Sequence, residues 1–206
     1  MKFSALRIVV FGIFLGLGAC ATPTQPSVNL SAYPPHPAPV DNFQVVVPHE
    51  IYRSGQPISA ADWAYLESVG VKTIIKLNEF SSKASAAVEI QEAKKHGIKV
   101  IPVYMQPEDF PHNLNPWARP DEAQLMRAVS ELENKNNGVM LVHCSHGKDR
   151  TGLVVALYSV RNKNYCKDTA YQQMKFYGAS PWLFGVKSAL DRSSIQQGQS
   201  CAQQYQ

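Results

Sequence analysis

Short apolar runs alternate with longer amphipathic segments through most of this 206-residue chain. Short runs rich in β-branched residues predict buried strands, and longer segments with a helical period predict helices. The strands are expected at 51–53, 73–77, 99–103 and 139–143. The helices are expected at 59–69, 85–96, 121–134, 150–161, 167–177 and 181–190.

This alternation predicts an α/β fold with a mainly parallel central sheet flanked by helices. Ligands of such sheets bind where the carboxyl ends of strands meet the amino ends of helices. The junction at 139–150 joins the most apolar strand to a largely apolar, and therefore buried, helix. We therefore expect functional residues at this junction.

The amino-terminal residues do not fit the alternating pattern. Lys2 and Arg7 precede an apolar run at 8–17, and small residues follow it. This is the composition of a secretory signal peptide over residues 1–19. The alternative, an uncleaved membrane anchor, is disfavoured because a spanning helix needs roughly 20 apolar residues.

The sequence Leu-Gly-Ala-Cys at 17–20 resembles the lipobox of bacterial lipoproteins. The resemblance implies that Cys20 is acylated and becomes the mature amino terminus, attached to a membrane. It further implies a place in the bacterial cell envelope, on the periplasmic face of the outer membrane. Residues 20–45 are proline-rich and predict an extended tether. Residues 46–192 form the predicted domain, and 193–206 a loose Gln-rich tail.

Composition changes this picture in two respects. A formal net charge of +4, without a basic stripe, gives no reason to expect a nucleic-acid partner. Cys166 and Cys201 are left over once Cys20 and the cysteine of the 139–150 junction are assigned. In an oxidising compartment they can pair and fasten the tail, or they can stay as two free thiols.

The junction carries Cys144 and Arg150 with five residues between them. A helix amino terminus offers free N–H groups and a dipole that favours an anion, so the loop can hold a phosphate. The same field stabilises a thiolate, which makes a cysteine nucleophilic at neutral pH. The planar guanidinium of Arg150 matches two phosphate oxygens, and Gly147 permits a tight turn. The alternative to a catalytic role is that Cys144 is a small apolar side chain buried in the core.

The segment His-Cys-Ser-His-Gly-Lys-Asp-Arg-Thr-Gly at 143–152 resembles the signature of the protein tyrosine phosphatase superfamily, especially its dual-specificity branch. Two further segments, 52–57 and 70–77, resemble strands of small dual-specificity phosphatases. The resemblance covers residues 46–192 and implies the Cys-x5-Arg phosphatase fold.

That resemblance also implies roles for the loop residues. Cys144 is the nucleophile that forms a phosphocysteine, Arg150 binds the phosphate in the transition state, and Thr151 helps the thiolate leave. His143 orients the loop. The remaining members of the phosphate-binding loop are Ser145, His146, Gly147, Lys148 and Asp149. No metal or other cofactor is expected.

The proton donor for the leaving group is expected on the segment 105–113, where the family places an Asp. Asp109 is the first choice, since it lies between two prolines and beside an aromatic residue. Asp121, which reads better as a helix N-cap, and Glu108 are the alternatives.

The substrate class stays open at this stage. Lys148 adds a cation beside Arg150, which resembles phosphatases of phosphoinositides and inositol phosphates, although an exposed loop lysine is commonplace. We expect phosphotyrosine, phosphoserine or phosphothreonine in proteins, or a phosphorylated lipid or small molecule. A pseudophosphatase that binds phosphate without turnover is the alternative function, and a rhodanese-type sulfurtransferase is a third interpretation.

Overall fold

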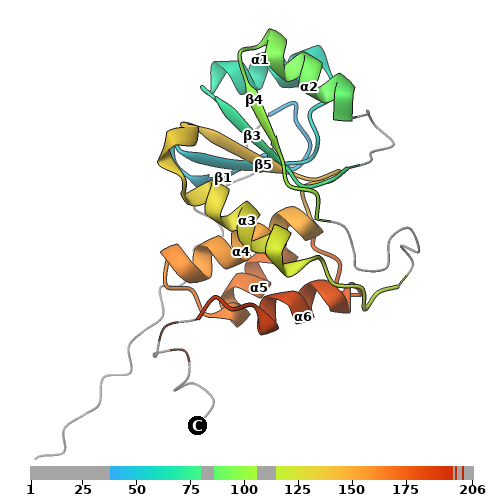
Figure 1. The fold of residues 1–206 in the computed structure, drawn as a ribbon, viewed down its shortest axis with the longest axis vertical. Coiled ribbons are helices and arrows are strands. Elements are labelled where there is room, and N and C mark those ends of the chain that lie inside the picture. Colours follow the sequence, from blue (N-terminus) through green and yellow to red (C-terminus); the bar gives the residue numbers. More distant parts are fainter. Residues whose placement is uncertain (1–37, 80–85, 106–114, 197, 199–200, 202–206) are drawn as a thin grey trace, which may run out of the picture.

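A computed structural model describes residues 38–79, 86–105, 115–196, 198 and 201. Its centre is a five-stranded sheet with the order β1-β2-β5-β3-β4 (Figure 1). The strands are β1 (Gln44–Val47), β2 (Ile51–Ser54), β3 (Thr73–Lys76), β4 (Lys99–Pro102) and β5 (Met140–His143). Neighbouring strands are parallel, apart from β1, which is antiparallel to β2. The predicted mainly parallel α/β sheet is confirmed.

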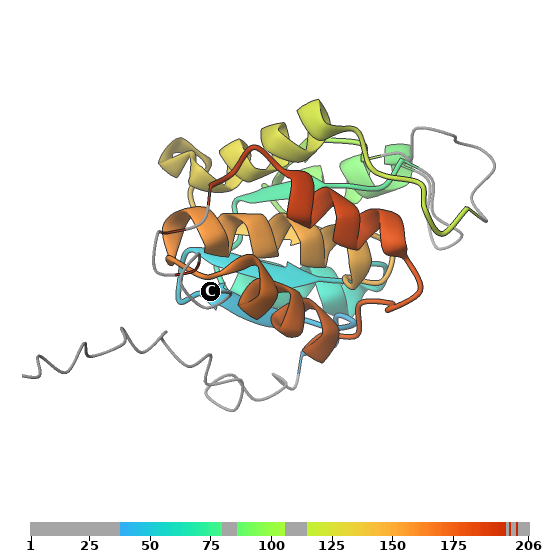
Figure 2. The same ribbon diagram turned by 90° about the horizontal axis from the view of Figure 1, so that it is seen from below.

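Helices cover both faces of this sheet (Figures 1 and 2). One face carries α1 (Ala60–Ser68) and α2 (Ala86–Lys95). The other face carries α3 and α4, with α5 and α6 packed beyond them. Their bounds are α3 (Glu122–Glu133), α4 (Asp149–Asn162), α5 (Lys167–Phe176) and α6 (Phe184–Arg192). A short 3-10 helix, Lys135–Asn137, leads into β5.

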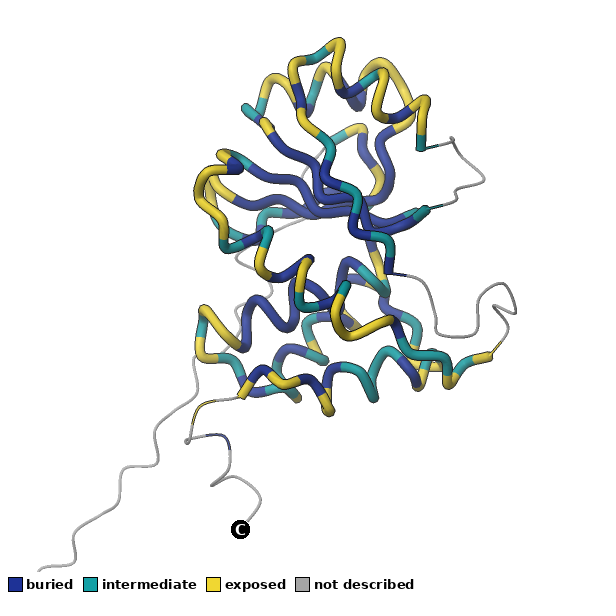
Figure 3. Tube along the Cα trace, viewed as in Figure 1, coloured by how far each residue is buried: buried dark blue, intermediate teal, exposed yellow. Residues whose placement is uncertain are grey.

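Each face of the sheet has its own apolar core, because successive side chains of a strand point to opposite sides. Ile74 and Leu141 pack with Trp63 of α1 in one core. Ile75 and Val142 pack in the other, against α3 and α4. Figure 3 shows the inner strands of the sheet buried; every residue of β2, β3 and β5 is buried, whereas β1 and β4 are only partly so. Burial on both faces explains why these strands read as continuous apolar runs.

Two helix starts follow from capping side chains. The Ser59 hydroxyl accepts a hydrogen bond from the Asp62 N–H at 3.1 Å, and the Asp62 carboxylate accepts one from the Ser59 N–H at 2.9 Å. Asp121 accepts from the Gln124 N–H at 2.8 Å. Each cap satisfies N–H groups that the first helical turn leaves without partners. Both starts agree with the sequence prediction.

The folded part begins before residue 46. Val40 and Phe43 are buried, and β1 starts at Gln44 and pairs with β2. Residues 40–45, which we assigned to the proline-rich tether, therefore belong to the fold in this structure. The apolar run that follows the prolines is too short to predict an edge strand.

The carboxyl-terminal tail is also tied to the domain. Cys166 and Cys201 form a disulfide with their Cα atoms 5.5 Å apart. Ile195 and Cys201 are buried, so these parts of the predicted loose tail pack against the domain. The disulfide fastens the tail to the start of α5.

The predicted signal peptide and Cys20 lie outside the described residues, so lipidation and an envelope location stay predictions. Within the described ranges, no helix is long and apolar enough to cross a membrane.

Candidate active site

The predicted phosphate-binding loop lies at the carboxyl edge of the central strand. Cys144 follows β5 directly, and the loop ends where α4 begins at Asp149. The register of β2 and β3 brings Ser54 and Lys76 beside His143 on β5. Parallel strands thus deliver side chains from three parts of the chain to the back of one loop.

The loop forms the base of a cleft of about 280 Å³. Cys144 is 6% exposed and is the sole cysteine outside a disulfide within the described part of the chain. The loop contributes five residues to the lining: Cys144, Ser145, His146, Asp149 and Arg150. The remaining wall is mostly apolar and consists of Met105, Asn115, Ala118, Pro120, Leu183 and Val186. The structure brings the predicted nucleophile and the predicted phosphate-binding arginine into the same cleft.

The loop requires glycine at position 147. Its backbone φ is +69°, in the left-handed region. A Cβ atom there would lie 2.4 Å from the carbonyl carbon of Ser54. The predicted role of Gly147 in the turn therefore has a second cause, which is close contact with β2.

Arg53 supports the loop from behind. It is 1% exposed, and its Nη2 donates to the Gly147 carbonyl at 2.5 Å. Its guanidinium lies over the Tyr177 ring, 4.6 Å from the centroid. Burial lowers the pKa of Arg53 to about 10, while Tyr177 and Cys144 act in the opposite direction. Arg53 thus stays cationic at neutral pH behind the predicted phosphate-binding loop.

A second support comes from Asn42, in the segment before β1. Its side-chain amide donates to the carbonyls of Gly147 at 3.0 Å and Tyr177 at 3.2 Å. These contacts join the phosphate-binding loop to the turn after α5. The loop is therefore held through its outward carbonyl groups by residues distant in sequence.

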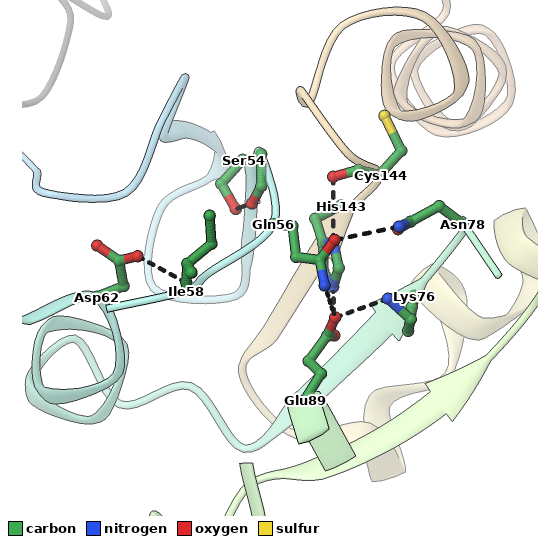
Figure 4. Close-up of polar contacts among 10 residues, drawn as sticks. Ser54, Gln56, Ile58, Asp62, Lys76, Asn78, Glu89, His143 and Cys144 are labelled. Carbon is green, nitrogen blue, oxygen red and sulfur yellow. Dashed lines mark hydrogen bonds and ion pairs between the residues drawn. The ribbon is translucent and has the colours of Figure 1, made fainter. Parts of the chain in front are cut away.

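His143 is fully buried and belongs to a polar network behind the loop (Figure 4). Its Nε2 lies 2.8 Å from Glu89 Oε1, and its Nδ1 lies 3.3 Å from the Cys144 carbonyl oxygen. Glu89 Oε2 accepts from Lys76 Nζ and from Gln56 Nε2, each at 2.6 Å. These contacts support the predicted orienting role of His143.

The charges in this network control the state of Glu89. Its burial would favour the neutral acid, but His143 and then Lys76 outweigh that effect and lower the pKa of Glu89 to about 2. The carboxylate is therefore ionised at neutral pH, although Glu89 is 1% exposed. A buried charge is tolerated when it is paired and hydrogen-bonded, as here.

Other predicted loop residues take different positions. Asp149 accepts the Ser180 N–H at 2.7 Å and so fastens the loop to the segment before α6. Lys148 does not line the cleft, and its aliphatic stem lies beside Gly178. Thr151 is fully buried, and its hydroxyl has no hydrogen-bond partner among the described residues, Cys144 included.

The predicted proton donor, Asp109, lies outside the described residues, as does Glu108. The alternative, Asp121, caps α3 through its hydrogen bond to Gln124. Within the described ranges, no group of three or more His, Cys, Asp or Glu side chains could hold a metal ion.

The sequence interpretation missed Arg53, Asn42, Lys76 and Glu89. A signal existed for two of them. Arg53 and Lys76 each interrupt a short apolar strand, and a charged side chain in such a strand needs a buried partner. Nothing in the sequence around Glu89 or Asn42 distinguished them from exposed polar residues.

Comparison with known proteins agrees with this geometry. Residues 37–165 match the model of the tyrosine phosphatase family. The dual specificity protein phosphatase TpbA of Pseudomonas aeruginosa is 25% identical over 164 residues, covering 78% of this chain and 59% of that protein. The inositol diphosphatase DSP4 of Arabidopsis thaliana is 29% identical over 139 residues, covering 68% of this chain and 65% of that protein.

A solved structure with a similar fold is the core catalytic domain of the PP-IP phosphatase SIW14 from S. cerevisiae. It superposes with a TM-score of 0.61 at 22% identity, over 76% of this chain and 87% of that one. The chain spans less than two thirds of the two curated relatives named above. The family match covers the sheet and the loop at residues 143–152, and the chain belongs to the tyrosine phosphatase family.

Proposed function

We propose that this protein is a cysteine-dependent phosphomonoester hydrolase that acts on aryl phosphates, of which phosphotyrosine is the natural example. The observation that carries the proposal is a free cysteine at the base of a cleft, at the amino end of a helix, with Arg150 in the same wall. A thiolate, a cation and a helix amino terminus at one point are suited to phosphoryl transfer.

The proposed reaction has two displacements. Cys144 attacks phosphorus, the sulfur–phosphorus bond forms and the bond to the leaving oxygen breaks. Asp109 gives that oxygen a proton. Water then attacks the phosphocysteine and releases phosphate, and Thr151 stabilises the departing thiolate by rotating its hydroxyl toward the sulfur. Arg150 and the loop hold the phosphoryl oxygens throughout.

The cleft wall favours an aryl group over a polyphosphorylated ring. Five lining residues are apolar: Met105, Ala118, Pro120, Leu183 and Val186. Arg150 is the one permanent cation in the described lining, since Lys148 lies elsewhere, and Asp149 adds a negative charge. The rings of Trp117 and Phe184 stack beside this wall with their centroids 4.5 Å apart, and Trp117 is 67% exposed. Apolar and aromatic surface suits a phenyl ring, whereas extra phosphates require further cations.

A phosphate-release panel tests this assignment. We expect the chain to hydrolyse p-nitrophenyl phosphate and phosphotyrosine peptides in the presence of a metal chelator. Its kcat/KM for phosphotyrosine should exceed that for inositol polyphosphates at least about tenfold, because one missing charge contact costs about that factor. Faster hydrolysis of inositol polyphosphates would refute the aryl assignment. Phosphate binding without hydrolysis of any substrate would favour the pseudophosphatase alternative.

The proposed donor is tested by Asp109→Asn with phosphotyrosine, whose leaving group needs a proton. We expect kcat to fall about 100-fold, the lower end of what general acid catalysis contributes. The decline in rate at alkaline pH, which reports loss of the donor's proton, should disappear. Asp121→Asn is the matched control and should keep that decline. An unchanged alkaline limb in Asp109→Asn would show that another group is the acid.

A further inference from the structure

Both ring nitrogens of His143 face oxygen atoms that accept hydrogen bonds. Nε2 lies 2.8 Å from a Glu89 carboxylate oxygen, and Nδ1 lies 3.3 Å from the backbone carbonyl of Cys144 (Figure 4). A neutral imidazole has one donor nitrogen and one acceptor nitrogen, whereas an imidazolium has two donors. A carbonyl oxygen cannot donate, and neither can an ionised carboxylate.

Glu89 is held in the ionised form by its other oxygen. That oxygen accepts from Lys76 Nζ and Gln56 Nε2, each at 2.6 Å. Gln56 is itself oriented, because its Oε1 accepts from the Asn78 amide at 3.2 Å. Two donors therefore stabilise the ionised carboxylate at Oε2, and an ionised carboxylate can only accept a hydrogen bond from His143 Nε2 at Oε1.

We infer that Glu89 is a positioning residue: it holds His143 as an imidazolium that donates to the Cys144 carbonyl and places a buried positive charge beside the nucleophile. The part that concerns the thiolate rests on the proposed function. The structure assigns this task to a side chain on α2, 54 residues away from His143. No motif around the phosphate-binding loop includes it.

The balance of charges shows why three groups are needed. Lys76 and Glu89 alone would cancel, and both side chains are 0% exposed. With a protonated His143, which is equally buried, the cluster carries one net positive charge. Among the described residues, the other charged or titratable groups near Cys144 include Arg53 on β2, His146 in the loop, and Arg150 and Asp149 at the start of α4. The cluster thus adds one positive charge near Cys144, in addition to the charges of Arg53 and Arg150.

The same network reaches the loop a second time. The backbone N–H of Gln56 donates to the Ser145 carbonyl at 3.3 Å. Glu89 therefore braces two successive carbonyl groups of the loop, those of Cys144 and Ser145, through His143 and Gln56. Carbonyl groups fixed on the outer side leave the loop N–H groups free to face an anion.

The direct test uses the unmodified full chain labelled with 15N-histidine. NMR at about pH 7–8, where an unpaired histidine is mostly neutral, should show protons on both ring nitrogens of His143. The signal is assigned by its loss in His143→Asn. A ring with one proton in this pH range would overturn the inference, whether or not the protein hydrolyses any phosphate.

The role of Glu89 is tested by the rate at which iodoacetamide alkylates Cys144 as a function of pH. In Glu89→Gln, His143 lacks its carboxylate, and an unpaired histidine loses its proton near about pH 6.5. We expect a new step in the alkylation profile near that pH. Above the step, the thiolate-dependent rate should be about tenfold lower than the rate extrapolated from below the step, a factor equivalent to one pKa unit.

Two control variants separate this effect from simple destabilisation. Lys76→Met damages the same buried cluster but keeps the Glu89–His143 pair, so its profile should show no new step. Glu92→Gln makes the same change on the exposed side of α2, where Glu92 pairs with Lys95. A profile for Glu89→Gln identical to that of Lys76→Met would refute the inference. If Glu89→Gln does not fold, the NMR measurement on the unmodified chain decides the inference.

Discussion

Replacing Cys144 with serine will lower kcat for p-nitrophenyl phosphate at least about a thousandfold, as expected when a covalent nucleophile is removed. A serine hydroxyl in the same place is a much weaker nucleophile than a cysteine sulfur. The cleft, Arg150 and the loop carbonyl contacts remain, so calorimetry should show that inorganic phosphate or tungstate still binds.

The control for this change is the double variant Cys166→Ser, Cys201→Ser. It also converts cysteines to serines but removes only the disulfide at the tail, away from the cleft. It should lose stability and retain hydrolysis at a temperature where it is folded. Hydrolysis by Cys144→Ser at the unmodified rate would exclude a covalent mechanism through this residue.

Changing Arg150 to lysine will lower kcat about 100- to 1000-fold, the usual loss when a donor to the transition state is removed. The charge is kept, but a single ammonium group cannot match two phosphoryl oxygens with the geometry of a planar guanidinium. Because the loss concerns the transition state, KM should change much less than kcat. Steady-state kinetics with p-nitrophenyl phosphate separates the two parameters.

Arg161→Lys provides the matched control on the same helix. Arg161 lies in the last turn of α4, at the surface, and pairs with Glu133 at 2.9 Å. An exposed pair of this kind contributes little, so both kinetic parameters should stay close to those of the unmodified protein. A similar loss in both variants would mean that Arg150 acts through the stability of α4 rather than on the phosphate.

The fold was predictable from local patterns to a large extent. The strand over 73–77 and the helix over 150–161 appear within a residue or two of their expected ends. Ser59 and Asp121 marked two helix starts, because a capping side chain acts on neighbouring residues only. The loop at 143–152 was likewise a local feature, with its glycine and arginine at fixed spacing.

What the sequence did not reveal depends on contacts between distant residues. Arg53 meets Gly147 across 94 positions, and Glu89 meets His143 across 54. Arg53 reaches the loop because β2 lies beside β5, and Glu89 comes from α2 on one face of the sheet; periodicity alone specifies neither arrangement. The position of the Lys148 stem was not evident for a similar reason, since the turn at Gly178 beside it follows a later helix.

The most direct test of the account is to trap the phosphoenzyme. A rapid denaturing quench during turnover of p-nitrophenyl phosphate, followed by digestion and mass spectrometry, should find one phosphoryl group on the peptide that contains Cys144, attached to its sulfur. The adduct should be absent from Cys144→Ser. A phosphoryl group on another residue, or steady turnover by Cys144→Ser, would contradict the account.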